Sequence, residues 1–572
     1  MSKIKIVLTS IAFFFYFNSS AQTTEYPQKY FQKPLDIPLI LSGTFGELRS
    51  NHFHSGLDIK TQQREGFNVY ATAAGYVSRI KISNWGYGKA VYITHPNGYT
   101  TVYGHLKKFN TKIEKYLKKR QYEKESYSIQ LYPKPEELPV SKGEIIAFSG
   151  STGGYVGAHL HYEIRNTATS KPINPLLFGV KIADHQKPVI NTLMAYPLAP
   201  NSQIHQSAIP VKINIKAQKD GTLLADSVIA HGTIGFGINA FDRQDGALNR
   251  NGLFSLEPYL NGKKIYKYKV ETFSFAESKY INLFIDYQRY KEKKQRIQKC
   301  FIEPANLLSI YDENLPEKGY ITIEDGKSYN VTIVAKDVAG NQTKLSIPIL
   351  GKEAPVSIPK IIHKTHYPIV ADEFNKYSKD GVTIAFPKNT FYKDFYLDFK
   401  VRVDGSVQVH KPIVPLNRSY TLTFDVSHYS EQDRKHLFIA YYNKNKYPTY
   451  SKTVKKENTF YTKTKKLGRF ALLSDFKAPE VSAANFKNEQ WLSKYHYLKF
   501  RIKDDLSGIK SYSGEIDGKW ILLEWDLKKG VLVYDFNDLK LTGTKHQVKI
   551  QVTDNADNTK TFTATFYRKQ TH

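Results

Sequence analysis

Two short histidine motifs early in the chain could bind a metal ion. The first runs from His54 to Asp58 and sets an imidazole and a carboxylate four residues apart. The second places His159 and His161 two residues apart, directly after a glycine-rich run at residues 150–158. Imidazole nitrogen and carboxylate oxygen are both ligands that zinc takes in proteins. Each motif also occurs by chance on ordinary surface strands, so the two carry weight only in combination.

The local sequence indicates which elements must position these side chains. Gly56 and the apolar residues around Asp58 indicate a turn that enters a strand. On a strand the side-chain period is two, so His159, His161 and Glu163 share one face while the residues between them pack on the other. His105 ends a further strand-like segment. A single histidine there is more often structural than catalytic, so it counts only with the other two motifs.

The surrounding sequence predicts an antiparallel β domain with one helical insertion. Short runs rich in Val, Ile, Tyr and Thr alternate with glycine turns between residues 66 and 106, and Asn97-Gly98 is a tight hairpin signal. Phe109, Ile113, Tyr116 and Leu117 then follow helical spacing among many lysines. We expect a basic surface helix within an insertion at about residues 107–139. Its basic face could guide an anionic polymer or could simply be solvated.

In this order and with these flanks, the motifs resemble the lysostaphin-like, LytM-type M23 family of zinc metallopeptidases. The resemblance covers about residues 45–178 and includes residues 53–59, 75–77, 85–88, 103–106, 150–153, 159–163 and 172–175. It implies that His54, Asp58 and His161 bind one Zn²⁺ ion in the peptidase domain. It also implies that His105 and His159 are the two catalytic histidines that do not bind the metal. His52 forms a second His-x-His with His54 and is the competing ligand.

The resemblance implies a zinc metalloendopeptidase that hydrolyses peptide cross-links of bacterial peptidoglycan during cell-wall remodelling. Three protein ligands leave a fourth position open for a water molecule, as in catalytic zinc sites. The alternative is a non-catalytic wall-binding protein that recruits or activates another wall hydrolase. HExxH and GxSxG motifs are absent from the sequence, which disfavours the zinc and serine hydrolase classes that they mark.

The rest of the chain predicts β-rich modules, so the expected fold class is mainly β. We expect a LytM-like peptidase domain at residues 22–186, immunoglobulin-like β-sandwiches at 187–351 and 477–572, and a β-rich module without a clear class at 352–476. A weak internal repeat supports the two sandwiches: residues 335–341 resemble 552–558, and the turns at 241–246 and 503–508 are also similar.

The start of the chain indicates an exported protein, and the charge and the cysteine count bear on its partners and its stability. Lysines followed by an apolar run and small residues predict a signal peptide at residues 1–21. We therefore expect a periplasmic or cell-envelope protein without a transmembrane segment after cleavage. The formal net charge of +29 suits an anionic wall polymer, and export argues against nucleic acid as a partner. The expected partners are peptidoglycan peptides and a possible regulatory protein. The single cysteine, Cys300, excludes an intramolecular disulfide and is expected in the core.

Overall fold

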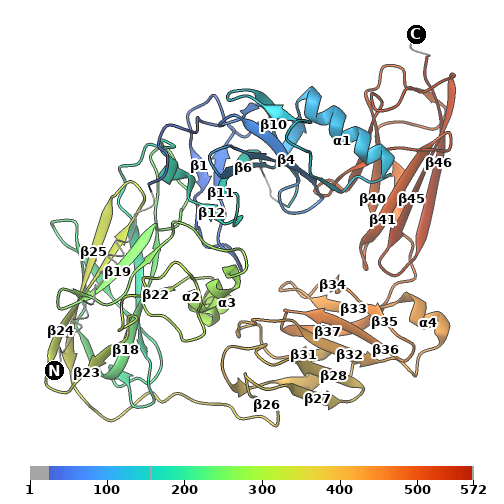
Figure 1. Ribbon diagram of the computed structural model, residues 1–572. Helices are drawn as coiled ribbons and strands as arrows, with labels where there is room; N and C mark the ends of the chain where they lie inside the picture. Colours follow the sequence, from blue (N-terminus) through green and yellow to red (C-terminus); the bar gives the residue numbers. More distant parts are fainter. Residues whose placement is uncertain (1–24, 155–156, 570–572) are drawn as a thin grey trace, which may run out of the picture.

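The structure is a computed structural model that describes residues 25–154 and 157–569. The predicted signal peptide lies outside these residues. Following the predicted boundaries, we call residues 25–186 the N-terminal domain, 187–351 module 1, 352–476 module 2 and 477–572 module 3 (Figure 1). The boundaries themselves stay predictions. The described elements are overwhelmingly strands in antiparallel sheets, which confirms the predicted fold class.

A nine-stranded sheet forms the centre of the N-terminal domain. Its main path is β1-β2-β11-β6-β5-β4-β8, with β12 on β11 and β9 on β4, and a smaller sheet has the order β3-β10-β7. The strands are β1 (Leu41–Gly43), β2 (Leu57–Lys60), β3 (Asn68–Tyr70), β4 (Gly75–Ile82), β5 (Lys89–Thr94), β6 (Tyr99–Gly104), β7 (Leu106–Phe109), β8 (Ile129–Leu131), β9 (Pro139–Val140), β10 (Ile145–Ser149), β11 (His159–Asn166) and β12 (Pro172–Ile173). A 3₁₀ turn, η1 (Pro175–Phe178), follows.

Helix α1 (Thr111–Glu123) lies in the region between β7 and β8. Asn110 caps its first turn by accepting a hydrogen bond from the Ile113 backbone N–H. Ile113 and Leu117 are buried, but Phe109, which we predicted on the helix face, lies in β7. The prediction for Phe109 was wrong because β7 ends at this residue, and the helix cap Asn110 follows directly.

Module 1 shares one continuous hydrophobic core with the N-terminal domain. Phe273 of module 1 is fully buried and contacts Phe45 and Phe53, with ring centroids 5.1 and 5.4 Å apart. Its strands are β13 (Val189–Pro197), β14 (Gln203–Ile204), β15 (Val211–Ile213), β16 (Ile215–Ala217), β17 (Leu223–Ala225), β18 (Val228–Phe241), β19 (Ser255–Leu260), β20 (Lys263–Lys264), β21 (Tyr268–Lys269), β22 (Gln298–Lys299), β23 (Ile321–Ile323), β24 (Ser328–Lys336) and β25 (Gln342–Gly351), with η2 (Ser278–Tyr280), α2 (Ile281–Phe284) and α3 (Tyr287–Lys293). Cys300 is buried here, and burial raises the pKa of its thiol, as suits a core residue.

Modules 2 and 3 each have a separate core: module 2 contains two five-stranded sheets and one two-stranded sheet, and module 3 contains a four-stranded and a five-stranded sheet. Module 2 contains β26 (Pro368–Ile369), β27 (Asn375–Lys379), β28 (Val382–Phe386), β29 (Phe395–Tyr396), β30 (Phe399–Val401), β31 (Val407–Val409), β32 (Tyr420–Asp425), α4 (Glu431–His436), β33 (Leu437–Tyr442), β34 (Pro448–Tyr450), β35 (Val454–Lys455), β36 (Thr459–Thr464) and β37 (Gly468–Ser474). Module 3 contains β38 (Glu480–Ala483), β39 (Gln490–Trp491), β40 (Tyr497–Lys503), β41 (Ile509–Ile516), β42 (Lys519–Trp520), β43 (Glu524–Asp526), β44 (Val531–Asp535), β45 (Lys545–Asp554) and β46 (Thr559–Tyr567).

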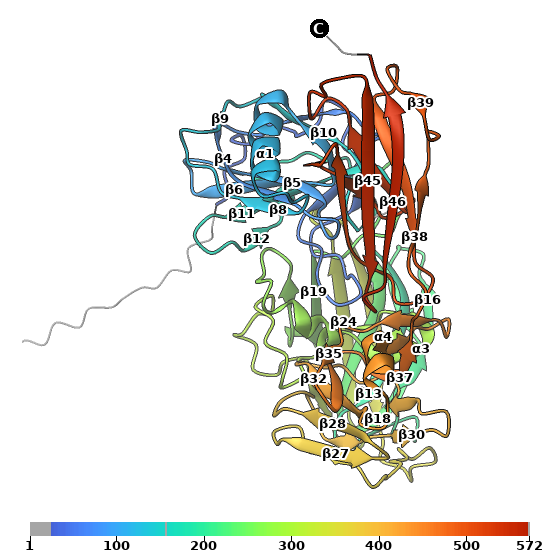
Figure 2. The ribbon, with the colours of Figure 1, turned by 90° about the vertical axis from the view of Figure 1, so that its right-hand side faces the viewer.

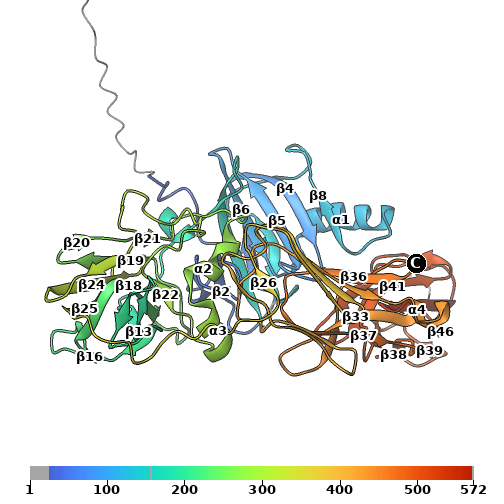
Figure 3. The same ribbon diagram turned by 90° about the horizontal axis from the view of Figure 1, so that it is seen from below.

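The four parts close into a ring, because module 3 returns to the N-terminal domain (Figures 1 and 2). Lys118 of α1 pairs with Asp538, whose side chain is only 2% exposed. The ring of Tyr122 lies 5.2 Å from that of Trp520. Seen from below, modules 1 and 3 lie on opposite sides of the N-terminal domain (Figure 3). Part of the helix that we expected to be solvated therefore contacts module 3.

Among residues 25–154 and 157–569, the structure contains no helix with the length and apolar character needed to cross a membrane.

The shared core predicts that the N-terminal domain and module 1 unfold together. Replacing Phe273 by Ala removes a fully buried ring and should lower the free energy of unfolding by about 3–5 kcal/mol. Calorimetry should show one transition for the two parts, moved to lower temperature. Leu248→Ala, at a side chain 91% exposed in module 1, is the control and should change the free energy by less than about 0.5 kcal/mol. Two separate transitions, only one of them moved, would contradict a shared core.

Candidate metal centre

The register of three neighbouring strands brings the predicted site residues together. In the central sheet β11 lies between β2 and β6. His161 on β11 pairs with Asp58 on β2 and with Gly104, the last residue of β6. His105 follows Gly104 directly, so all three motifs meet at one place on the sheet. A one-residue slip would turn His161 to the opposite face, because side chains alternate along a strand.

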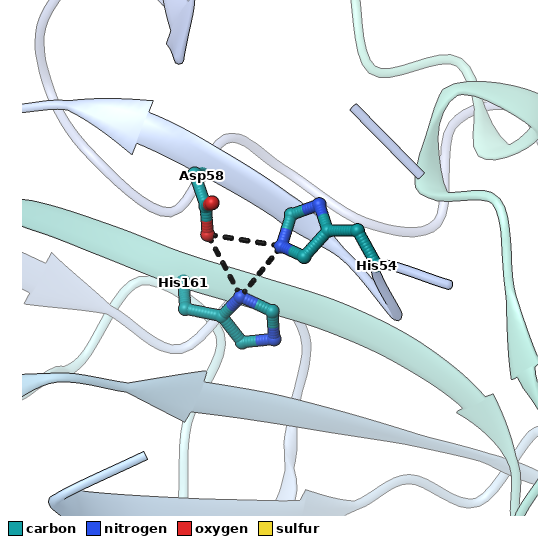
Figure 4. Close-up of side chains that lie close together, drawn as sticks. All are labelled: His54, Asp58 and His161. Carbon is teal, nitrogen blue, oxygen red and sulfur yellow. Dashed lines mark hydrogen bonds and ion pairs between the residues drawn. The ribbon is translucent and has the colours of Figure 1, made fainter. Parts of the chain in front are cut away.

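His54, Asp58 and His161 form a compact buried cluster (Figure 4). Asp58 Oδ1 lies 3.0 Å from His54 Nε2 and 2.9 Å from His161 Nδ1, and the two nitrogens are 3.2 Å apart. Ligands that bind zinc tetrahedrally at about 2.0–2.2 Å lie roughly 3.3–3.5 Å from one another. The three atoms therefore have nearly the spacing and the donor chemistry that a zinc ion requires.

The outer ring nitrogens of both histidines are held by fixed acceptors. His54 Nδ1 lies 2.8 Å from the carbonyl oxygen of Thr44, and His161 Nε2 lies 2.7 Å from Glu163 Oε1. A carbonyl and an ionised carboxylate only accept hydrogen bonds, so each of these nitrogens must carry the proton. In the neutral rings the lone pairs of His54 Nε2 and His161 Nδ1 therefore face each other and Asp58. This is the arrangement by which hydrogen bonds to carbonyl and carboxylate groups orient metal-binding histidines.

Glu163 is the centre of this support and is fully buried. It accepts hydrogen bonds from Ser55 Oγ at 2.7 Å, from the Tyr87 hydroxyl at 2.5 Å and from Arg165 Nε at 2.5 Å. Burial alone would raise the pKa of Glu163, but the charges of Arg165 and His161 lower it well below its usual range. Glu163 is thus an ionised acceptor for His161. The sequence placed it on the same face as the histidines but gave it no role.

Asp58 is held from its outer side by Arg49. Arg49 Nη2 lies 3.0 Å from Asp58 Oδ2 and 3.3 Å from Glu47 Oε2. Burial alone would raise the pKa of Asp58, but His54 and His161 lower it well below its usual range. The carboxylate is therefore charged, with one oxygen toward the histidines and the other toward Arg49. No pattern in the sequence indicated Arg49, because its contact arises from the turn that precedes His54.

His105 and His159 lie beside the cluster with their rings 4.6 Å apart. His105 Nδ1 lies 2.8 Å from the Thr152 carbonyl oxygen and His159 Nδ1 lies 3.1 Å from the Gly157 carbonyl oxygen. His159 Nε2 is 3.6 Å from Asp58 Oδ1. Burial, together with the charges of His161 and His159, lowers the pKa of His105 to about 3, and burial also lowers that of His159. Both rings are therefore neutral at pH 7, with the proton on Nδ1.

The structure leaves the competing His52 outside the cluster. Its side chain is exposed, and its Nδ1 lies 3.1 Å from Asn51 Oδ1. Gly56 lies between the two candidate ligands His54 and Asp58, and a Cβ atom there would lie 2.3 Å from the Tyr162 carbonyl oxygen. A glycine is required there because β11 passes so close.

Comparison with known proteins finds two family models that match parts of the chain. The model of peptidase family M23 matches residues 52–122, and the model of the Zu5-like domain matches residues 366–475. The DD-carboxypeptidase/endopeptidase Mpg of Neisseria meningitidis is 35% identical over 129 residues, which are 23% of this chain and 23% of that protein. An uncharacterized metalloprotease of Haemophilus influenzae is 33% identical over 123 residues, 22% of this chain and 20% of that protein. The match thus spans less than a quarter of the length of either relative.

Among solved structures, the catalytic domain of lysostaphin from Staphylococcus simulans is 23% identical, with 24% of this chain and 90% of that chain covered and a TM-score of 0.18.

An antiparallel β domain with a buried His-Asp-His cluster and two flanking histidines defines a metallopeptidase domain. This domain resembles peptidase family M23, whose model matches residues 52–122. The Zu5-like match supplies a class for module 2, which the sequence had left without one.

The support of His161 by Glu163 predicts an effect on metal affinity. Glu163→Gln keeps the shape of the side chain but removes the ionised acceptor, so it should weaken Zn²⁺ binding by about 10–100-fold. Competition against a chelator of known affinity measures this. Glu144→Gln, at an acid of the same domain that is remote from the cluster, is the matched control and should leave the affinity unchanged. Equal affinities for all three proteins would show that Glu163 does not support the metal ligand.

The protonation of His161 predicts a pH-dependent zinc affinity. Burial alone would lower the pKa of His161, but hydrogen bonds to Asp58 and Glu163 raise it to about 9 in the metal-free protein. Below that pH a metal ion must displace a proton from His161, so zinc affinity should rise about tenfold per pH unit from pH 7 to 8.5. Glu163→Gln removes the charge of one of the two acceptors, so its affinity should level off at a lower pH. Equal wild-type affinities at pH 7 and 8.5 would contradict this protonation state.

Proposed function

We propose that this protein is an exported zinc metalloendopeptidase that hydrolyses peptide cross-links of bacterial peptidoglycan. The observation that carries the proposal is the convergence of His54 Nε2, His161 Nδ1 and Asp58 Oδ1, with both imidazole lone pairs oriented inward. With both rings neutral, such a convergence of donor atoms is expensive without a cation, because each inward nitrogen then offers only a lone pair.

The residues around the cluster have the properties that amide hydrolysis needs. When bound, zinc supplies a Lewis acid that polarises a carbonyl and lowers the pKa of a water molecule. His105 and His159 are neutral and hold their protons on Nδ1, so each can accept a proton at Nε2 and later donate it to a leaving amine. Which of the two serves each step stays open. The Thr152 and Gly157 carbonyl groups orient these rings.

The substrate class is supported by the relatives and by the charge of the chain. The relative from Neisseria meningitidis is described as a DD-carboxypeptidase/endopeptidase, which is a class that acts on cell-wall peptides. The formal net charge of +29 favours association with an anionic wall polymer. The N-terminal sequence supports export to the periplasm or cell envelope, and thereby access to this substrate.

The alternative is a wall-binding protein that recruits or activates another hydrolase. A protein of that kind has no need for a metal site, so its site residues are free to change. Here the three candidate ligands and both flanking histidines are present and lie close together. The cluster therefore favours the enzyme.

The test is zinc content together with peptide release from purified peptidoglycan. The protein without its predicted signal peptide should bind about one zinc ion and release peptides, and His161→Ala should lose both. His105→Ala and His159→Ala should keep the zinc and lower the rate by about 10²–10⁴-fold. His52→Ala, at an exposed histidine close in sequence but outside the cluster, is the matched control and should keep both properties.

Two other outcomes would contradict the proposed function. A wild-type protein that binds zinc but releases no peptide from any wall preparation would refute wall hydrolysis. Cosedimentation with peptidoglycan would then support the wall-binding alternative. A wild-type protein that binds no zinc after incubation with the metal would overturn the metal site itself.

A further inference from the structure

A second group of converging ligand atoms lies where module 1 meets the N-terminal domain. Asp184 comes from the connector before β13, Asp242 follows β18, and Asp337 follows β24. One carboxylate oxygen of each lies within 4.8 Å of the others. Asp242 and Asp337 are 3% and 4% exposed. In the part of the chain that the structure describes, none of the three forms an ion pair with a basic side chain.

Two buried oxygen atoms at this place have no hydrogen-bond partner among the described residues. They are Asp242 Oδ1 and Gln244 Oε1, and both side chains are more than nine-tenths buried. Asp242 and Gln244 line one cavity together with Asp184 and Asp337. Burial and the charges of Asp184 and Asp337 raise the pKa of Asp242 to about 8. Burying hydrogen-bond acceptors without a donor costs free energy. A cation in the cavity would coordinate both oxygen atoms and offset that cost.

Module 3 repeats the same three sequence motifs, which shows that the arrangement is a built feature. Each module has Asp-x3-Pro, Asp-x3-Gly and Asp-x3-Asn in this order: residues 184–188, 242–246 and 337–341 in module 1, and 475–479, 504–508 and 554–558 in module 3. The carboxylates of Asp475, Asp504 and Asp554 also converge.

The hydrogen bonds at the third motif repeat as well. In module 1 the Asn341 amide donates to Asp337 Oδ2 at 2.9 Å and to the Asp184 carbonyl oxygen at 3.2 Å. In module 3 the Asn558 amide donates to Asp554 Oδ2 at 2.8 Å and to the Asp475 carbonyl oxygen at 2.9 Å. In module 3, however, backbone N–H groups reach a carboxylate of every cluster member. Among the described residues of the two sets of motifs, the unpartnered carboxylate and amide oxygen atoms belong to module 1, whereas the unpartnered atom in module 3 is the Ser507 hydroxyl.

We propose that Asp184, Asp242 and Asp337 bind a Ca²⁺ ion. The candidate ligands are all oxygen atoms, which suits a hard cation and disfavours zinc with its preference for nitrogen and sulfur. Carboxylates from three separate segments, with Gln244 Oε1 as a further neutral oxygen in the same cavity, match the irregular oxygen shell of Ca²⁺ better than the strict octahedron of Mg²⁺.

The bound ion would fix the junction between the metallopeptidase domain and module 1. It joins the connector at Asp184 to two loops of module 1. Thr44 lines the same cavity, its hydroxyl accepts a hydrogen bond from the Gly252 N–H at 3.2 Å, and its carbonyl accepts from His54. The calcium site thus adjoins the support of a candidate zinc ligand. The inference itself holds whether or not the domain hydrolyses peptidoglycan.

The test is Ca²⁺ binding by the full chain without its predicted signal peptide, measured by equilibrium dialysis with one equivalent of Zn²⁺ present throughout. At a free Ca²⁺ concentration that half-saturates the wild-type site, Asp242→Asn should fill that site to about one tenth or less, because its affinity falls at least about tenfold. Ca²⁺ should raise the melting temperature of the wild type by roughly a few degrees and that of the variant by less. Asp220→Asn, at an exposed acid of module 1, changes the same charge and should behave as the wild type.

If Asp242 had a purely structural role, its replacement should destabilise the calcium-free protein. The calcium site predicts the opposite. Asp242→Asn replaces a carboxyl whose ionised form is unfavourable at this buried position, so without Ca²⁺ it should be at least as stable as the wild type. If that variant fails to fold, Asp184→Asn tests the same ion at a half-buried position. The proposal is overturned if the wild type binds no Ca²⁺ at millimolar concentration, or if these variants bind as many ions as the wild type.

Discussion

The candidate active site depends on the antiparallel register that sets Asp58 and Gly104 on either side of His161. Hydrogen bonding in a sheet fixes neighbouring strands to within one residue, and the alternation of side chains then decides which face each residue occupies. Residues about 100 positions apart in the chain therefore lie side by side because their backbones are paired in the sheet. The same register places His105 beside the cluster, because the chain leaves β6 one residue after Gly104. Gly56 is required by this packing, since β11 leaves no room there for a side chain.

Around the cluster, charges are paired so that a buried polar group rarely lacks a partner. Arg165 balances Glu163, and Arg49 lies against the outer oxygen of Asp58. Buried ion pairs of this kind contribute little net stability, because desolvation offsets most of the Coulomb attraction. Their effect is to fix orientation: the ionised Glu163 holds the proton of His161 on Nε2, and the Thr44 carbonyl does the same for His54 Nδ1. The two inward lone pairs are a consequence of these outer bonds, so the outer residues belong to the metal site as much as the ligands do.

The sequence predicted the residues whose arrangement is local and missed those that depend on packing. His159, His161 and Glu163 could be placed on one face because strand periodicity alone decides it, and the ordered motifs indicated His54, Asp58 and His105. Thr44 and Arg49 carry no such signal, and Tyr87 lay in a matched motif without an assigned role, since each of the three reaches the cluster only through the fold. The contact of α1 with module 3 was equally invisible, because nothing in a lysine-rich helix indicates which acids lie opposite. The similar turns of modules 1 and 3 were visible as a repeat, but the convergence of their aspartates with Asp184 required the fold.

The ring explains how modules remote in sequence can affect the site. Module 1 holds the hydroxyl of Thr44, and the carbonyl of the same residue orients His54. From the other side, Lys528 of module 3 donates a hydrogen bond to the carbonyl of Ser151, and the next carbonyl, that of Thr152, orients His105. Module 1 thus contacts a residue that orients one candidate active-site histidine, and module 3 contacts the neighbour of a residue that orients another. A shift of either module would move such a carbonyl, and in enzymes a displacement of an ångström in a positioning group is enough to weaken catalysis. The geometry of the metal centre is for this reason a property of the closed ring and not of the N-terminal domain alone.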